Sequence, residues 1–241
     1  CTIPKPSSGT LSGHAAGEPF DKCVYSVLKE QYRENTFRQY EYLNDLFSKN
    51  PTAKGYEKRM ALFPSSIISF LLARGKDATK KWSLTKQFEE KQNDTADILM
   101  VKDDFYNLID VKTRNISKSS QAPNIISSYK LAQLCAKMID TEKYDNFSID
   151  YFEIDWALDG KLLRCTDAHH ACLFNCDPEK LYINWASGMQ IQFHVCDADQ
   201  SFEGSRAVWA ELYLKHFAEG AEERIKYMRE EYINAFESYL L

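Results

Sequence analysis

The sequence predicts an α/β fold, or α+β fold, in which helices flank a mixed sheet. Apolar residues follow helical spacing through the N-terminal third and again over residues 206–240, whereas the middle of the chain shows short apolar or alternating runs typical of strands. With 241 residues, of which 44% are hydrophobic, the chain can bury a sizeable core. It therefore fits one large domain, or two small ones at most, and a single domain over residues 1–241 is expected.

The N-terminal third is expected to be helical after an initial arm. Residues 1–13 are rich in Pro, Ser and Gly and are predicted to form an arm or loop. A helix is expected to start at Pro19, because proline suits the first turn of a helix. Further helices are expected over residues 36–48, 52–62, 65–73 and 76–90, broken by Pro64 and Gly75.

The middle of the chain is expected to supply the sheet. Apolar runs predict strands over residues 96–101 and 105–113, and their short polar connector allows a hairpin. A loop over residues 115–124 and a helix over 127–139 follow. More strands are expected over residues 149–158, 161–165, 181–186 and 189–195, before a mostly helical C-terminus.

Charge is distributed unevenly along the chain. The net charge of −5 argues mildly against a general nucleic-acid binder. Residues 111–139, however, contain no acidic side chain and five basic ones: Lys112, Arg114, Lys118, Lys130 and Lys137. A basic cleft in an acidic body would draw a polyanion to one place. The alternative is an ordinary solvated segment.

The cysteines and the apolar runs indicate the compartment. Seven cysteines without a regular framework favour reduced thiols in a cytoplasm. No run of eighteen apolar residues predicts a membrane span, and no signal peptide is visible. A zinc site could be argued from one cluster, but its spacing matches no standard finger or ribbon, so incidental thiols and imidazoles are favoured; the cluster is Cys165, His169, His170, Cys172 and Cys176.

One constellation carries chemistry: Asp97, followed thirteen positions later by Asp110-Val111-Lys112. Each aspartate lies at or near the end of a predicted strand, and residues two apart on a strand share a face, as Asp110 and Lys112 do. Hard divalent cations bind carboxylate oxygens, and a lysine beside them can hold or activate a water. The constellation suits metal-assisted phosphodiester hydrolysis. The alternative is a chance Asp-x-Lys at a solvated strand end.

Longer strings around this constellation carry a family resemblance. Asp97 and Asp110-Val111-Lys112 resemble the catalytic motif of PD-(D/E)xK nucleases. The strings EEKQNDTADIL (89–99), DVKTRNISK (110–118), QAPNIIS (121–127), SGTLSGHAAGEPF (8–20) and LYINWA (181–186) are similar to the HincII/HindII family of type II restriction endonucleases. The similarity spans nearly the whole chain. Ala96 stands where the superfamily often has proline, which ligates nothing.

The resemblance implies a restriction-endonuclease-like core in a homodimer that cuts double-stranded DNA. The implied target is a palindrome, GTYRAC or GTTAAC, cut at its centre to leave blunt ends with 5′-phosphates. Asp97, Asp110 and the carbonyl of Val111 are expected to bind Mg²⁺, for which Mn²⁺ can substitute, while Lys112 acts on the attacking water. Neither a small-molecule cofactor nor a membrane is implied, and the location is the bacterial cytoplasm.

The resemblance also places residues on the bases of the DNA. Asn124, Tyr182 and Asn184 match base-contacting positions. The chemistry fits, because an amide offers both a donor and an acceptor to a base edge. Without the resemblance, a strand edge and a turn would be the preferred interpretation of Tyr182 and Asn184.

Other residues are expected to bend and hold the duplex. Gln121 matches a residue that wedges between bases from the minor groove, and Gln92 is its neighbour in that region. Such insertion unstacks and bends DNA, most easily at a pyrimidine–purine step. Arg114, Lys118 and Lys130 are candidates for phosphate contacts, which position a protein without reading sequence.

Several alternatives remain open. Glu18 could assist through a second metal ion or a water, or be a simple helix-start carboxylate. The protein could instead be a structure-specific repair or recombination nuclease, which would cut flaps or junctions. It could also be an inactive DNA-binding relative, against which the intact Asp97, Asp110 and Lys112 argue, or a small-molecule metalloenzyme, which the basic window disfavours.

Overall fold

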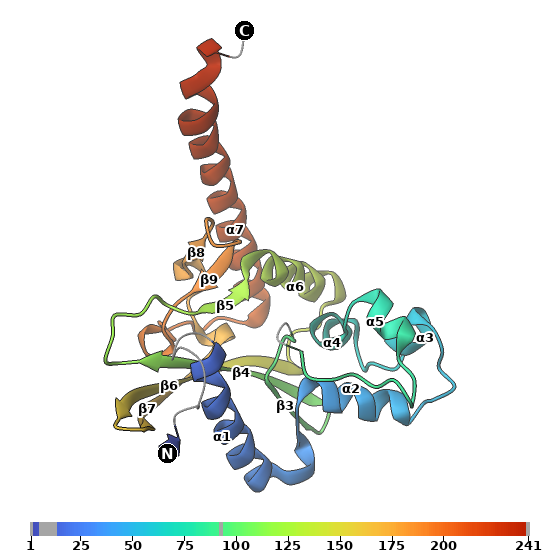
Figure 1. Cartoon of the computed structure of the whole chain (residues 1–241). Coiled ribbons are helices and arrows are strands. Elements are labelled where there is room, and N and C mark those ends of the chain that lie inside the picture. The colour runs from blue at the N-terminus through green and yellow to red at the C-terminus, as the bar shows by residue number, and fades with distance from the viewer. Residues whose placement is uncertain (1, 5–13, 92–93, 240–241) are drawn as a thin grey trace. The chain divides into compact units, whose positions relative to one another are not determined.

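The structure is a computed structural model that describes residues 2–4, 14–91 and 94–239. The chain divides into two compact units. Unit 1 comprises residues 1–121 and 145–173, and unit 2 comprises residues 122–144 and 174–241 (Figure 1). Helices and a mixed sheet confirm the predicted fold class. The single domain over residues 1–241 stays a prediction.

Unit 1 is built on a six-stranded sheet with the order β1-β7-β6-β4-β3-β2. Adjacent strands in this sheet are antiparallel, except that β4 and β6 are parallel, so the sheet is mixed. The strands are β1 (Thr2–Pro4), β2 (Thr36–Phe37), β3 (Ile98–Lys102), β4 (Phe105–Asn115), β6 (Phe147–Asp159) and β7 (Leu162–Cys172).

Strands β3 and β4 form the predicted hairpin. Its two-residue turn is Asp103-Asp104, and both residues have positive φ angles of 49° and 62°. Positive φ at both central positions is the conformation whose twist matches paired strands, and aspartate tolerates it. The register pairs Ile98 with Ile109, so continuing it by one residue places Asp97 opposite Asp110.

The two faces of this sheet differ in chemistry. On one face, Ile154, Trp156 and Leu163 form a buried cluster with Phe20 of α1 (His14–Tyr32), and Val111 packs against that cluster. Side chains alternate along a strand. The residues on either side of Val111 therefore point to the opposite face, where the charged side chains of β4 gather.

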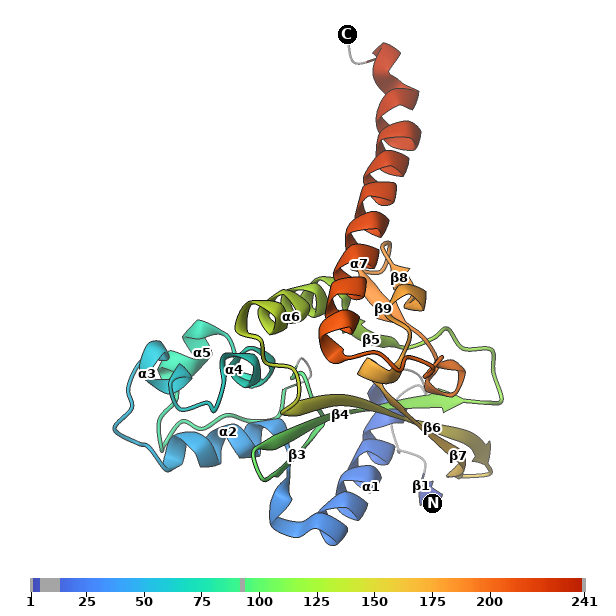
Figure 2. The same ribbon diagram turned by 180° about the vertical axis from the view of Figure 1, so that it is seen from behind.

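Four short helices lie beside the β3–β4 hairpin (Figure 2). They are α2 (Gln39–Ser48), α3 (Tyr56–Met60), α4 (Ser66–Leu72) and α5 (Lys76–Lys81), and a 3-10 turn, η1 (Arg33–Asn35), precedes β2. The prediction of helix to residue 90 is wrong beyond Lys81. The Asn44 side chain instead bonds Trp82 and the backbone of Phe88, and these tertiary bonds replace helical ones.

Three boundaries near the sheet differ from the sequence predictions. Helix α1 begins at His14, so Pro19 lies inside it, where it costs one intrahelical hydrogen bond. Residues 2–4 of the predicted arm form β1, paired with β7, whereas residues 5–13 lie outside the described residues. Strand β7 continues to Cys172 because it pairs with β6 along its whole length.

Unit 2 combines a small sheet with two long helices. The sheet has the order β5-β9-β8, from β5 (Asn124–Ser127), β8 (Ile183–Asn184) and β9 (Gln190–Gln192). Helix α6 (Ser128–Thr141) is capped by Ser127 and packs against α7 (Arg206–Met228), whose Tyr213 hydroxyl donates to the Ser128 carbonyl over 3.0 Å. Short 3-10 turns are η2 (Leu173–Asn175), η3 (Pro178–Lys180) and η4 (Val195–Asp197).

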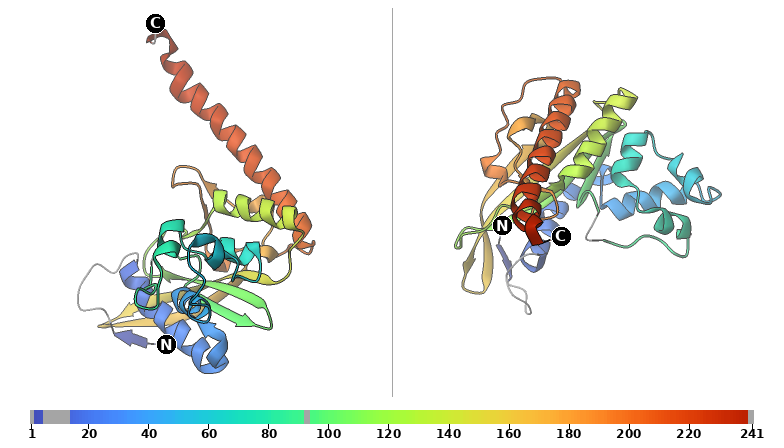
Figure 3. Two further views of the ribbon diagram at one scale, coloured as in Figure 1. Left: turned by 90° about the vertical axis from the view of Figure 1, so that its right-hand side faces the viewer. Right: turned by 90° about the horizontal axis from the view of Figure 1, so that it is seen from above.

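The C-terminal helix runs beyond the rest of unit 2 (Figure 3). After α7 the chain continues as a π-helical turn (Arg229–Ile233) and a 3-10 turn (Asn234–Tyr239), so the helical prediction holds for the described residues. Among the helices in the described ranges, none has the length and apolar character needed to cross a membrane.

Candidate active site

The two aspartates of the motif meet where β3 and β4 are paired. Asp97 directly precedes β3, and its Oδ2 accepts a hydrogen bond from the backbone N–H of Val111 over 2.8 Å. Burial and the adjacent Asp110 charge raise the pKa of Asp97 to about 7. Two carboxylates that face each other in a half-buried place repel each other, and a bound cation removes that repulsion. The pair therefore fits a hard divalent cation.

The lysine of the motif lies beside the second aspartate. Lys112 Nζ is 2.7 Å from Asp110 Oδ2, and both side chains project from the same face of β4. Their side chains are 21% and 19% exposed, so the ammonium group remains reachable from solvent. It can hold a water or a phosphate oxygen next to the carboxylate pair.

The backbone of Val111 faces the same site. In a strand, the N–H and C=O of one residue point to the same edge, so the Val111 carbonyl lies at the edge where its N–H meets Asp97. Within the described residues, no group of three or more His, Cys, Asp or Glu side chains could hold a metal ion. An ion here would take its remaining ligands from water or substrate, as Mg²⁺ usually does.

Glu18 does not start a helix. It lies within α1, and its carboxylate pairs with Lys22 Nζ at 2.6 Å. Half of the Glu18 side chain is exposed (50%), so this is a surface i,i+4 pair. The helix-start interpretation is wrong because α1 begins earlier, and an accessory role in catalysis stays a prediction.

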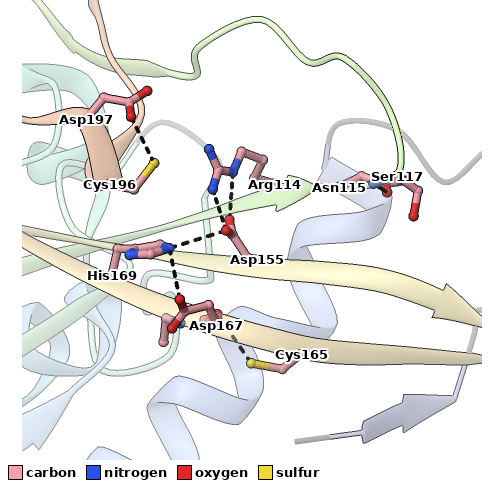
Figure 4. Close-up of polar contacts among 10 residues, drawn as sticks. Arg114, Asn115, Ser117, Asp155, Cys165, Asp167, His169, Cys196 and Asp197 are labelled. Atoms are coloured by element: carbon pink, nitrogen blue, oxygen red, sulfur yellow. Dashed lines mark hydrogen bonds and ion pairs between the residues drawn. The ribbon is translucent and has the colours of Figure 1, made fainter.

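A second charged cluster lies further along the same strands (Figure 4). Arg114 Nε donates to Asp155 Oδ1 over 2.8 Å, a second guanidinium nitrogen bonds Oδ2, and His169 Nε2 is 3.2 Å from Oδ2. Burial would raise the pKa of Asp155, but the bonds from Arg114 and His169 bring it below its ordinary value. The Arg114 guanidinium is thus occupied by an internal carboxylate, and its phosphate contact stays a prediction.

The cysteines and histidines of β7 do not converge. His169 and His170 are adjacent on the strand and so point to opposite faces. The Cys165 thiol contacts the backbone carbonyl of Asp167 at 3.5 Å (Figure 4). The six cysteines that the structure describes form no disulfide with one another. This geometry favours incidental thiols and imidazoles over a zinc site.

The predicted base-reading amides come together in unit 2. Asn184 Nδ2 donates to Gln192 Oε1 over 2.9 Å, and Gln192 Nε2 donates to Asn124 Oδ1 over 2.7 Å. Gln192 was missed by the sequence analysis, because only the strand order β5-β9-β8 places it between the two asparagines. Tyr182 is 62% exposed, and its carbonyl accepts from the Gln192 N–H over 3.1 Å.

The remaining DNA-binding candidates are more scattered. Lys118 and Gln121 are exposed on the segment between β4 and β5, and Lys130 lies in the first turn of α6. Gln92 lies outside the described residues. The contact of these four residues with DNA stays a prediction.

Comparison with known proteins gives consistent matches over the whole chain. A family model described as "Restriction endonuclease HincII" matches residues 1–240. The chain is 60% identical over 239 residues to the type II restriction enzyme HindII of Haemophilus influenzae (strain ATCC 51907 / DSM 11121 / KW20 / Rd), covering 99% of this chain and 93% of the relative. It is 59% identical over 239 residues to the type II restriction enzyme HincII of Haemophilus influenzae, with the same coverage of 99% and 93%.

Proposed function

The chain belongs to the HincII restriction endonuclease family and is a type II restriction enzyme, and from this we infer the details of its reaction. It is therefore a nuclease that acts on double-stranded DNA, in a family that generally needs a divalent metal ion. We propose that it hydrolyses both strands of a palindromic GTYRAC-class site, GTYRAC or GTTAAC, leaving blunt ends with 5′-phosphates. The observation that carries this proposal is the meeting of Asp97, Asp110 and Lys112 on one hairpin.

The carboxylate pair is proposed to hold the metal ion. Asp97, Asp110 and the carbonyl of Val111 would hold Mg²⁺, and Mn²⁺ can substitute because it prefers the same oxygen ligands. A bound ion supplies charge neutralisation at the scissile phosphate and lowers the pKa of a water that it holds. The raised pKa of Asp97 supports this role, since the carboxylate gains most from a cation that takes the place of its proton.

Lys112 is proposed to act on the water and the phosphate. Its ammonium group, fixed by Asp110, would orient the attacking water and stabilise the negative charge that grows on the phosphate. In-line attack by this water breaks the bond to the 3′-oxygen, which leaves with a proton as a 3′-hydroxyl. The phosphate stays on the 5′ end.

The amides of unit 2 are proposed to read the outer base pairs. Asn124, Asn184 and Tyr182 would contact base edges, and Gln192 would fix the orientation of both asparagines. Asn184 Oδ1 also accepts from the backbone N–H groups of Ala186 and Ser187, so the orientation of this amide is fixed at both ends. An amide with a fixed orientation can meet a base edge without rearrangement. The fixed orientation of these amides supports the proposal that neutral side chains read the outer base pairs.

The central base pairs are proposed to be read through bending. Gln121 is exposed, which suits insertion between bases, with Gln92 assisting it. Unstacking costs least at a pyrimidine–purine step, so a central Y-R step could be selected without direct contacts. Lys118, Lys130 and Arg114 would contact phosphates.

The assembly is proposed to be a homodimer in the bacterial cytoplasm. A palindrome has two-fold symmetry, and two identical active sites must each meet one strand. A dimer with C₂ symmetry satisfies both conditions. A nuclease that cuts incoming DNA must also be present where that DNA arrives.

The test is a digest of a fully sequenced plasmid with purified protein and Mg²⁺, followed by sequencing of the fragment ends. Blunt, 5′-phosphorylated ends centred on GTYRAC or GTTAAC are expected, and they would identify the central bases. A parallel digest with Mn²⁺ and flap or junction substrates serves as the comparison. Cutting of junctions without discrete plasmid fragments would instead indicate a structure-specific nuclease, and no cutting at all an inactive binder.

A further inference from the structure

The residues that lead into β3 are held by side chains far away in sequence. Gln39 Oε1 accepts from the backbone N–H of Ala96 over 3.0 Å, and Arg38 Nη1 donates to the backbone carbonyl of Asp97 over 3.1 Å. These two bonds fix the peptide groups on both sides of the Ala96-Asp97 pair. We propose that Gln39 and Arg38 are positioning residues that hold the Asp97 carboxylate in its metal-binding orientation.

Gln39 and Arg38, which together form the Asp97 clamp, are themselves buried and held by other residues. Gln39 is 3% exposed, and its Nε2 donates to the Leu72 carbonyl at the end of α4 over 2.9 Å. Arg38 is 7% exposed, and its Nη1 also bonds Asp21 Oδ1 of α1 at 2.7 Å. A ligand supported in this way loses little orientational freedom when it binds an ion.

The local sequence explains why a clamp is needed here. Ala96 occupies a position where proline would fix the backbone through its ring, and alanine leaves φ free. Alanine instead has the N–H that proline lacks, and this N–H is the donor to Gln39. The hydrogen bond supplies restraint in place of the ring, and the buried Gln39 carbonyl gains a partner.

The two bonds act on backbone groups and do not involve the Asp97 carboxylate. Asp97 uses one side-chain oxygen for the Val111 N–H, while the clamp occupies only main-chain atoms. The bonds of Gln39 and Arg38 at this site go to the backbone of residues 96 and 97, so their proposed effect passes through Asp97. This inference rests on the proposed metal-binding role of Asp97.

The test compares Gln39→Met with a matched variant, Asn44→Leu. Asn44 is another amide on α2 with three hydrogen bonds, to Trp82 and to both backbone groups of Phe88, and none of these bonds goes to residues 96 or 97. Three quantities are measured for each variant: thermal stability, binding of Mn²⁺ to the DNA-free protein by electron paramagnetic resonance, and the Mg²⁺ concentration that gives half-maximal cleavage.

We expect Gln39→Met to weaken Mn²⁺ binding and to raise the half-maximal Mg²⁺ concentration by about 10-fold. Asn44→Leu should lower stability to a similar extent and leave both metal readouts within about two-fold of wild type, since a structural hydrogen bond alone affects folding. Equal metal binding in both variants and wild type would overturn the clamp.

Two further variants keep the test decisive. If Gln39→Met does not fold, Gln39→Glu retains an acceptor for the Ala96 N–H and should bind Mn²⁺ more tightly than Arg38→Met, which removes the other half of the clamp. The reverse order would contradict the proposal. Asp97→Asn must abolish metal-dependent cleavage. Wild-type behaviour of that variant would reject the metal assignment itself, separately from the clamp.

Discussion

The two sheets of this protein hold their polar groups in opposite ways. The six-stranded sheet of unit 1 carries charged groups in close pairs, such as Lys112 with Asp110 and Arg114 with Asp155. The three-stranded sheet of unit 2 instead links three neutral amides, Asn124, Gln192 and Asn184, in a row. Charges respond to pH, metal ions and salt, whereas amides respond only to the pattern of donors and acceptors that meets them.

This difference fits a division of labour. Hydrolysis of a phosphodiester needs charge at the phosphate, and charge gathered in a buried place has a cost in folding stability. Base reading needs geometry more than charge, and neutral hydrogen-bonded groups can provide it at lower cost. Mutations in the six-stranded sheet should therefore lower the rate of cleavage, whereas mutations in the three-stranded sheet should lower the selectivity for the DNA sequence.

The largest effect should come from the charged sheet. Lys112→Ala is expected to lower the single-turnover cleavage rate by about 10²–10⁴-fold, because the water loses its orienting group. Binding to the same duplex in Ca²⁺ should stay near wild type. Lys102→Ala, an exposed lysine at the other end of the β3–β4 hairpin, is the control and should cleave normally. Cleavage by Lys112→Ala at the wild-type rate would remove Lys112 from the mechanism.

A smaller loss, of a different kind, is expected from the amide sheet. Gln192→Leu should reduce kcat/KM on the cognate site by about 10–100-fold, because Asn124 and Asn184 lose their shared partner and 1–3 kcal/mol of discrimination depends on such contacts. For DNA sites with one altered outer base pair, kcat/KM should fall by a smaller factor. The ratio of kcat/KM between cognate and altered sites should therefore decrease. Gln190→Leu on the same strand lies outside the amide row and serves as control. Equal losses on cognate and altered sites would contradict the reading role.

The cost of placing the Asp97 charge next to Asp110 should be measurable as a lower free energy of unfolding. Since the pKa of Asp97 is raised above its ordinary 3.8 to about 7, ionising this carboxyl group destabilises the fold. The penalty is complete above about pH 7 and is lost gradually as the pH falls from there toward 3.8. Asp97→Asn should therefore stabilise the metal-free protein by about 1–3 kcal/mol at pH 8 and by much less at pH 5. Urea unfolding in EDTA at both pH values measures this.

Asp155→Asn provides the comparison of opposite sign. The pKa of Asp155 is lowered, so its charge stabilises the fold above the unfolded pKa, and that stability is lost only as the pH falls through the folded pKa. Its replacement should destabilise the protein at pH 8. If both aspartates shifted stability in the same direction, the account of their environments would be wrong.

The smallest effect should come from an exposed charge. Lys118→Ala is expected to weaken DNA binding by about two- to five-fold on every sequence and to lower the salt slope by about one unit, as loss of one phosphate contact does. A filter-binding series in KCl on cognate and random duplexes measures both. Arg114→Gln in the same series shows whether a guanidinium paired with Asp155 also meets phosphate. A sequence-dependent loss for Lys118→Ala would indicate base contact instead.

Much of the catalytic hairpin could be predicted from the sequence. The apolar runs around Asp97 and Asp110 and the short connector defined two paired strands, and the i,i+2 spacing placed Asp110 and Lys112 on one face. These are local rules, so local sequence suffices. The end of the helix at Lys81 was not predictable in this way, because Asn44 competes for the backbone of Phe88 from 44 positions away.

By itself, the sequence determined the fold class and the family, and it supplied the motif of Asp97, Asp110 and Lys112 that is proposed to be catalytic. Only the tertiary structure decided which side chains support that motif. The bond of Arg38 to Asp97 spans 59 positions and that of Gln39 to Ala96 spans 57, and Gln192 reaches Asn124 across 68. Periodicity constrains neighbours a few residues apart, whereas these partners depend on which strands and helices pack together, and packing is set by the whole chain at once.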